Sequence, residues 1–250
     1  MKKRPTFPAQ LESTVAKPRA VPLPLLGSVP QGLGMDSQAV RQRMVQKLQG
    51  QGITDSAVLA AMGTVERHRF VDSALVNQAY EDTSLPIGLG QTISKPGVVS
   101  RMAELLRNGR QEKLGRVLEI GTGCGYQAAV LSFLATEVYS IERLRGLHDK
   151  ARENLRHLRL PNVHLLFGDG REGYAKGAPY AAIIAAAGGE AVPPAWIDQL
   201  AVGGRLVAPV VTSGAQGGSQ ALLVLDKTAQ GVRSSLLEAV HFVPLKSGVA

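Results

Sequence analysis

The chain has 250 residues, of which 44% are hydrophobic and 4% aromatic, and it carries a formal net charge of +8. This length is enough for one domain with a sizeable core. The single cysteine, Cys124, excludes an intramolecular disulfide and any zinc site built from several cysteines. No apolar run reaches the length of a transmembrane helix, and no apolar signal-peptide segment follows the basic residues 2–4. We therefore expect a cytoplasmic protein with no membrane partner.

Half of the net positive charge lies in the first 34 residues, which carry five basic residues, one acidic residue and six prolines. This composition predicts a disordered, basic, proline-rich tail over 1–34. Residues 35–250 are predicted to form one domain, with a helical cap and substrate loop over 35–110 and a cofactor-binding sheet with C-terminal strands over 111–250. Because a nucleic-acid footprint should lie on a folded surface, the net charge alone is weak evidence for an RNA or DNA partner.

Apolar residues at helical spacing mark the start of this domain. Ser37 can cap a helix that ends near Gly50, and a second short helix fits 55–62. His68, between two arginines in the segment that follows, is interpreted as a surface residue on a connecting turn.

Residues 85–97 read LPIGLGQTISKPG. Their glycines, prolines and small polar residues predict an irregular loop, and Pro96 suits the first turn of a following helix. Ser94 lies at that helix entrance together with Thr92. Local chemistry alone favours Ser94 as a helix cap over Ser94 as a site residue.

The most informative stretch is 115–143, GRVLEIGTGCGYQAAVLSFLATEVYSIER. It predicts a strand, a glycine loop (Gly121, Gly123, Gly125), a helix and a second strand that ends at Glu142. A βαβ unit with a glycine-rich first turn is typical of a nucleoside-cofactor site. Glu142 follows Gly121 by 21 residues, about where the second strand delivers a carboxylate to ribose hydroxyls.

Two details of this stretch bear on the cofactor. The dinucleotide fingerprint GxGxxG has a third glycine where this chain has Tyr126. Glu119, just before the loop, would repel a pyrophosphate but suits the ammonium group of a methionine moiety. The pattern favours S-adenosylmethionine over NAD or FAD, and the alternative interpretation of the glycines is a plain strand-to-helix turn.

Asp169 lies between two glycines after a further strand, on the rim where open α/β sheets bind ligands. Its carboxylate could accept a hydrogen bond from the adenine amino group, or Asp169 could be a solvated turn residue. Trp196 and His241 are interpreted as packing or edge residues. Strands are predicted at 117–120, 138–141, 163–167, 181–187, 203–211, 221–225 and 232–243. With the intervening helices they predict an α/β fold, a doubly wound, mostly parallel, Rossmann-like sheet of seven strands with N-terminal helices and a C-terminal antiparallel hairpin.

Together these segments resemble the protein-L-isoaspartate (D-aspartate) O-methyltransferase family, over roughly residues 37–250. The glycine loop alone would indicate only a class I methyltransferase, whereas the QTIS string at 91–94 and the FVPL string at 242–245 are more specific. The other segments that carry the resemblance are FV at 70–71, LPIGLG at 85–90, VLEIGTGCGYQAAVL at 117–131, SIER at 140–143, GDG at 168–170 and GGRLVAPV at 203–210.

The resemblance implies roles for individual residues. It makes Ser94 the active-site residue, which reverses the local preference for a cap. It places Thr92 and Ile93 beside the substrate, and Phe242 and Val243 on a terminal strand along the bound peptide. It implies no metal. The implied cofactor residues are Glu119, Gly121, Thr122, Gly123, Gly125, Glu142, Arg143, Asp169 and Gly170.

The resemblance also implies a reaction. S-adenosylmethionine would methylate the free α-carboxylate of isoaspartyl residues in damaged proteins and peptides, giving S-adenosylhomocysteine and an ester that closes to a succinimide and so starts repair. A carboxylate is already ionised near neutral pH, so no strong base is needed. The hydroxyls of Ser94 and Thr92 would position it. We expect a monomer with no nucleic-acid partner.

Two departures from the family pattern concern the floor of the cofactor cleft. Residues 181–187 lack the family's usual first aspartate and Val-Thr-Ala-Ala ending, and 188–190 replace a more usual Ala/Pro-rich turn. Alternative functions are an RNA methyltransferase and a non-catalytic adenosine-nucleoside binding module. Against the first, this chain lacks an Asn/Asp-Pro-Pro-Tyr run for methylation of base amino groups and a Pro-Cys pair for a cysteine nucleophile. Tyr126 disfavours a nicotinamide oxidoreductase.

Overall fold

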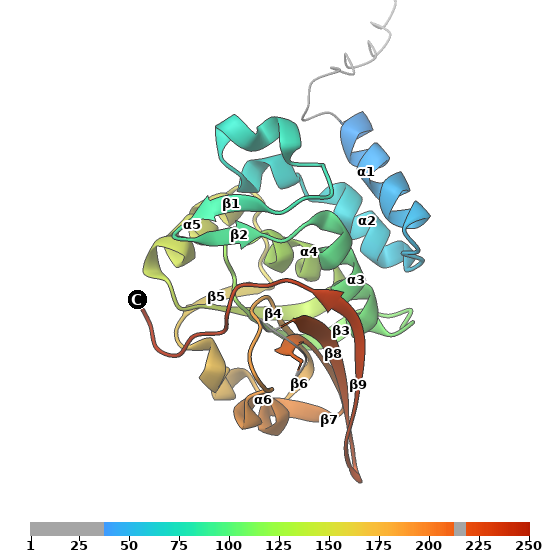
Figure 1. Ribbon diagram of the computed structural model, residues 1–250, viewed down its shortest axis with the longest axis vertical. Helices are drawn as coiled ribbons and strands as arrows, with labels where there is room; N and C mark the ends of the chain where they lie inside the picture. The colour runs from blue at the N-terminus through green and yellow to red at the C-terminus, as the bar shows by residue number, and fades with distance from the viewer. Residues whose placement is uncertain (1–37, 213–218) are drawn as a thin grey trace, which may run out of the picture. The chain divides into compact units, whose positions relative to one another are not determined.

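The centre of the computed structural model, which describes residues 38–212 and 219–250, is a seven-stranded sheet (Figure 1). Strands β3 to β7 run parallel to one another, and β8 is antiparallel to both of its neighbours. In spatial order the strands are β5 (Val163–Phe167), β4 (Ala135–Glu142), β3 (Leu114–Ile120), β6 (Tyr180–Ala185), β7 (Leu200–Val211), β8 (Gln220–Thr228) and β9 (Gly231–Val240). The predicted fold is therefore confirmed. The strand order reverses between β3 and β6, which is where such sheets bind ligands.

Helices cover both faces of the sheet. One face packs a core against α3 and α4, and the other packs Trp196 of α6 against β3, β6 and β7. The helices are α1 (Gln38–Gly50), α2 (Ser56–Thr64), α3 (Pro96–Arg107), α4 (Tyr126–Leu134), α5 (Arg145–Arg156) and α6 (Pro194–Gln199). Short 3-10 turns are η1 (Arg67–Phe70), η2 (Ser73–Gln78), η3 (Gly170–Glu172) and η4 (Ala175–Gly177). Within the described ranges, no helix combines the length and apolar character that crossing a bilayer requires.

Most predicted elements are found within a few residues of their predicted bounds. The last strand is an exception, because β9 ends at Val240 and the predicted continuation to Val243 is wrong. Ser37 and the predicted tail lie outside the described residues.

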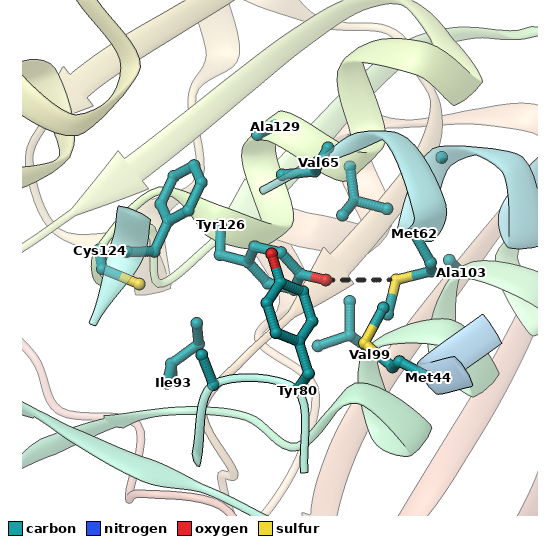
Figure 2. Packing of buried hydrophobic residues seen from close by; sticks show 14 of the residues in the cluster. Met44, Met62, Val65, Tyr80, Ile93, Val99, Ala103, Cys124, Tyr126 and Ala129 are labelled. Atoms are coloured by element: carbon teal, nitrogen blue, oxygen red, sulfur yellow. Dashed lines mark hydrogen bonds between the residues drawn. The ribbon is translucent and has the colours of Figure 1, made fainter. Parts of the chain in front are cut away.

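Tyr126, which stands where dinucleotide folds have a third glycine, fills the core beneath the N-terminal helices (Figure 2). Its ring packs edge-on against Phe70, and its hydroxyl donates to Met62 Sδ at 3.7 Å. Burial raises the pKa of Tyr126 to about 12, so the phenol stays neutral. The large side chain therefore joins the helical cap to the start of α4.

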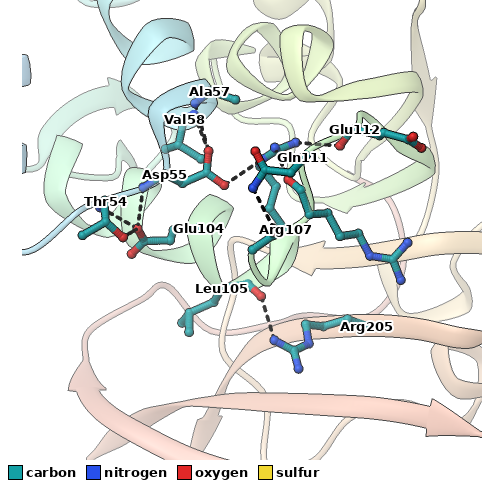
Figure 3. A network of polar contacts seen from close by, with 12 residues as sticks. Thr54, Asp55, Ala57, Val58, Glu104, Leu105, Arg107, Gln111, Glu112 and Arg205 are labelled. Carbon is teal, nitrogen blue, oxygen red and sulfur yellow. Dashed lines mark hydrogen bonds and ion pairs between the residues drawn. The ribbon is translucent and has the colours of Figure 1, made fainter.

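A polar network ties the cap to the sheet (Figure 3). Asp55 caps α2 by accepting from two backbone N–H groups, and it accepts a 2.7 Å bond from the buried Arg107 of α3. Glu104 accepts from the backbone N–H groups of Thr54 and Asp55. Arg205 of β7 donates to the Leu105 carbonyl at 3.1 Å. These bonds fix α3 and thereby the segment that precedes it.

That preceding segment is a small antiparallel hairpin of β1 (Leu85–Gly88) and β2 (Gln91–Ile93), so the prediction of an irregular loop is wrong here. The chain reverses through positive φ angles at Gly88, Leu89 and Gly90. Tertiary contacts stabilise the hairpin, because Leu85, Ile87 and Ile93 are buried in the cap core.

Candidate active site

The glycine loop at residues 121–125 leads from β3 into α4 at the point where the strand order reverses. Gly121, Gly123 and Gly125 have φ angles of 90°, 56° and 90°. Residues other than glycine rarely adopt these φ angles, so the sequence GxGxG fits the path of this backbone. The loop lines a cleft together with the ends of β3 and β4.

Glu142, at the end of β4, holds the loop in place. Its Oε2 accepts from the Gly123 N–H and its Oε1 from the Leu144 N–H, both at 2.9 Å. The side chain is largely buried but lines the cleft. Its carboxylate oxygens retain further acceptor capacity for a ligand hydroxyl.

Beneath the loop lies a buried chain of polar groups. Thr122 Oγ1 and Ser140 Oγ are 2.6 Å apart, and Ser140 donates to Glu119 Oε2 at 2.5 Å. Glu119 Oε1 has no hydrogen-bond partner among the described residues, and neither does the Nε2 of Gln127. Burial raises the pKa of Glu119 to about 8, because removal from water penalises the carboxylate more than the hydrogen bond from Ser140 stabilises it.

The hairpin supplies the opposite wall of the cleft through Thr92, Ile93 and Ser94. Lys150 of α5 holds it by donating to the Ile87 carbonyl at 2.9 Å. Lys95 is the N-cap residue of α3, so the interpretation of Ser94 as the cap is wrong. Within 38–212 and 219–250, the Ser94 hydroxyl makes no hydrogen bond, which leaves it available to a ligand.

A second cavity adjoins the cleft, and both are lined by Thr92, Ser94, Ala186 and Val243. Other residues of the second cavity include Ser84, Lys95, Val98, His241 and Phe242. No acidic side chain is among its described lining residues. The two cavities therefore meet at the predicted active-site hydroxyls, and the second one is neutral to basic.

At the far end of the cleft, Gly170 is buried and Arg143 lines the wall. The Trp196 indole donates to the Gly170 carbonyl at 2.8 Å, and a Cβ at Gly170 would come within 2.6 Å of Ile120. Asp169 does not line the cleft. Its Oδ1 accepts from the Arg171 N–H at 2.8 Å and its Oδ2 from the Gly248 N–H at 2.5 Å.

The structure thus brings most of the predicted site residues to one cleft. The cleft is lined by Thr92, Ile93, Ser94, Gly121, Thr122, Gly123, Glu142, Arg143, Gly170 and Val243. Phe242 lines only the second cavity, while Glu119, Gly125 and Asp169 lie next to the lining rather than in it.

Sequence reasoning missed other lining residues. Leu89, at the hairpin tip, is 62% exposed and reaches the cleft. Gln127 and the segment 244–246 also line it. The FVPL string pointed to Pro244 and Leu245, but nothing local indicated Leu89.

Two reaction classes find no support in this geometry. In the described part of the chain, no group of three His, Cys, Asp or Glu side chains could hold a metal ion. Cys124 is buried, and burial raises the pKa of its thiol to about 11, so it is unsuited to act as a nucleophile.

The cleft fits S-adenosylmethionine on its own chemistry. The unpartnered Glu119 Oε1 suits an ammonium group, the glycine backbone allows close approach, and Glu142 can accept from ribose hydroxyls. Together with the parallel sheet, this arrangement defines a class I methyltransferase.

Comparison with known proteins identifies the family. A profile of the protein-L-isoaspartate(D-aspartate) O-methyltransferase family matches residues 39–250. The chain belongs to this family, as predicted. Its members transfer a methyl group from S-adenosylmethionine, so the predicted enzyme class and cofactor are confirmed.

Individual relatives agree. The chain is 56% identical to a protein-L-isoaspartate O-methyltransferase of Methylibium petroleiphilum, over 98% of this chain and 96% of the relative. It is 55% identical to one of Leptothrix cholodnii, over 98% of this chain and 85% of that one. A solved protein-L-isoaspartate O-methyltransferase superposes with a TM-score of 0.74 at 27% identity, over 84% of this chain and 67% of the other. A putative one from Plasmodium falciparum, in complex with S-adenosyl-L-homocysteine, superposes with a TM-score of 0.69 at 23% identity. The match covers 82% of this chain and 98% of the other, and it supports the fold.

Proposed function

We propose that the chain methylates the α-carboxylate of isoaspartyl residues at the junction of the two cavities. The observation that carries this proposal is that Thr92 and Ser94 line both the cofactor cleft and the second cavity. A peptide acceptor in the second cavity and a methyl donor in the cleft would meet at these two hydroxyls.

The glycine loop, Glu119 and Glu142 would hold S-adenosylmethionine, with the methionine ammonium near Glu119 and the ribose near Glu142. When bound, this cofactor supplies an electrophilic methyl group carried on a sulfonium. The proximity of Glu119 to a cation would favour its carboxylate form. The protein would therefore release a proton when the cofactor binds at pH values below about 8.

On the acceptor side, Ser94 and Thr92 would donate hydrogen bonds that orient the carboxylate. A base is not needed, because the acceptor is already an anion near neutral pH. Orientation and exclusion of water would supply most of the rate enhancement, since effective molarity in well-aligned sites is worth several kcal/mol. Lys95 would favour an anionic peptide in the second cavity.

The proposal extends to organisation and partners. Residues 35–250 would act as one methyltransferase domain, which the compact packing of the described residues supports. Damaged proteins and peptides, not RNA, would be the acceptors, and the enzyme would work as a monomer in the cytoplasm. Native mass measurement and cell fractionation test the last two statements.

The test of the function uses labelled S-adenosylmethionine and three acceptors: an isoaspartyl peptide, the matched aspartyl peptide and bulk RNA. We expect a base-labile methyl ester on the isoaspartyl peptide alone, followed by the appearance of succinimide and aspartyl products. Equal labelling of both peptides, or labelling of RNA alone, would contradict the proposal. Cofactor binding without labelling of any acceptor would favour the non-catalytic alternative.

A further inference from the structure

The segment that follows β9 crosses the carboxyl edge of the sheet, and Figure 1 shows it in red running from β9 toward the side of α5. It is anchored first on Gly188, after β6. The Gly188 N–H donates to the Val243 carbonyl and the Leu245 N–H donates to the Gly188 carbonyl, both at 2.8 Å. Leu245 also packs against the core of the α6 face. This anchor fixes the near end of the segment.

The far end is held at the ends of β4 and β5. The Ala250 N–H donates to the Arg143 carbonyl, and the Arg145 N–H donates to the Ala250 carbonyl, both at 2.8 Å. Arg143 Nε donates to the Gly248 carbonyl at 2.9 Å. The Gly248 N–H donates to Asp169 Oδ2 at 2.5 Å. Residues 246–250, here called the strap, therefore span the strand ends between the two anchors.

Residues 243–246, at the near anchor, line the cofactor cleft together with Glu142 and Arg143. Lys246 brings the strap to this lining, where Glu142 marks the proposed ribose position. Arg143 and Asp169, both predicted to touch the cofactor, form hydrogen bonds with Gly248.

The two ends of the segment differ in how firmly they are held. Leu245 is packed, whereas every residue from Lys246 to Ala250 is exposed. Exposed backbone hydrogen bonds with no apolar burial belong to the part of a protein that opens most easily. The strap can therefore detach at its far end while its near end stays anchored.

We propose that Arg143 and Asp169 are positioning residues that dock the strap over the adenosine end of the cleft, so that strap opening limits the exchange of S-adenosylhomocysteine for S-adenosylmethionine. The inference rests on the proposed placement of the ribose beside Glu142. Asp169 Oδ2 accepts from Gly248 while its Oδ1 accepts from Arg171, so one carboxylate couples the strap to the end of β5.

The test measures the release rate of labelled S-adenosylhomocysteine, chased with excess S-adenosylmethionine. The proteins are the full chain, Arg143→Ala, Arg143→Lys and a variant without residues 247–250. Arg171→Ala is the matched control, because this exposed arginine contributes only its backbone N–H to Asp169. We expect release to be at least about tenfold faster in Arg143→Ala and in the shortened variant, since loss of interface contacts acts mainly on dissociation. Arg143→Lys, which keeps a donor, should lie between, and Arg171→Ala should match the full chain.

A second measurement follows amide hydrogen exchange in the strap itself. Amide exchange at Gly248 and Ala250 should slow when S-adenosylhomocysteine binds the full chain, and should lose this response in Arg143→Ala. Unchanged release rates in variants that still bind the ligand would overturn the proposed role of the strap and leave the proposed function standing. Faster release in Arg143→Ala but not in the shortened variant would also overturn it, because Arg143 would then act by direct contact. Failure of the full chain to bind the ligand would remove the proposed function as well.

Discussion

The glycine loop at 121–125 and the hairpin β1–β2 face each other across the cleft, and both turn through positive φ angles. They are held in different ways. The loop continues directly from β3 into α4 and is clamped by Glu142 of the adjacent strand. The hairpin depends on distant partners, because Lys150 binds its backbone and Ile87 and Ile93 are buried in the cap core. The cofactor wall is thus encoded locally, while the acceptor wall is assembled by tertiary contacts.

This difference predicts that changes at the loop alter cofactor binding, and changes at the hairpin alter peptide transfer. Four substitutions test that division.

The largest expected effect lies under the loop, at Glu119. Its pKa in the folded chain is about 8, against 4.5 for the ordinary side chain. Its contribution to stability is therefore fully present below about pH 4.5 and is lost as the pH rises through about 8. The free energy of unfolding should fall by about 1.4 kcal/mol per pH unit in this window on account of this residue.

Glu119→Gln should remove that part of the slope. Urea unfolding of both proteins at several pH values, without cofactor, measures the difference. Identical slopes would show that Glu119 is ionised in the folded chain and would contradict its placement in a dry pocket.

Gly121→Ala is expected to be next in size. With φ at 90°, alanine is strained by about 1 kcal/mol or more, and relief of the strain would move the backbone that contacts the cofactor. The dissociation constant for S-adenosylhomocysteine should rise at least about tenfold, which is about 1.4 kcal/mol. Calorimetric titration measures it.

Gly52→Ala is the matched control, because Gly52 has a φ of 100° and open space around its Cβ position. It should lose similar stability and keep its affinity for the ligand. Equal affinity losses in both variants would refute a specific role for the loop.

Ser94→Ala tests the hairpin side. Loss of one hydrogen bond to a carboxylate should lower kcat/KM for an isoaspartyl peptide by about tenfold. The affinity for S-adenosylhomocysteine should stay within about twofold, because Ser94 lies on the acceptor wall. Ser73→Ala, an exposed serine outside both cavities, should change neither value. A loss of cofactor affinity as large as the loss of transfer would break the division between the two walls.

The smallest effect is expected outside both walls. Arg101 of α3 and Glu238 of β9 form a 2.8 Å ion pair whose side chains are 40% and 42% exposed. Glu238→Gln should cost less than about 1 kcal/mol, and the cost should shrink at high salt. Urea unfolding at two salt concentrations checks this. A larger, salt-independent loss would show that α3 depends on this pair to present the hairpin.

The same division decides how much could be predicted from the sequence. The glycine spacing and the distance to Glu142 follow from the local geometry of a βαβ unit, so the loop, its neighbouring strands and the fold class were predictable. The apolar run of β6 also reads directly as a strand buried on both faces.

The errors and omissions involve contacts between distant residues. The hairpin was predicted as a loop because its apolar residues are buried by the cap, which its own glycines do not reveal. Ser94 looked like a cap, yet Asp82, twelve residues upstream, accepts the Gly97 N–H at 2.7 Å instead. The segment after β9 leaves the sheet because its backbone bonds to Gly188 and Arg143, neither of which is near it in sequence.

We infer that the cofactor cleft and the second cavity meet at Ser94 and Thr92. A crystal structure of the full chain with S-adenosylhomocysteine and an isoaspartyl peptide tests it most directly. We expect a peptide carboxylate within hydrogen-bond distance, about 3 Å, of one of these hydroxyls, with the ligand's sulfur on the cleft side of that carboxylate. A peptide bound elsewhere, with the Ser94 hydroxyl turned away from its carboxylate, would contradict it.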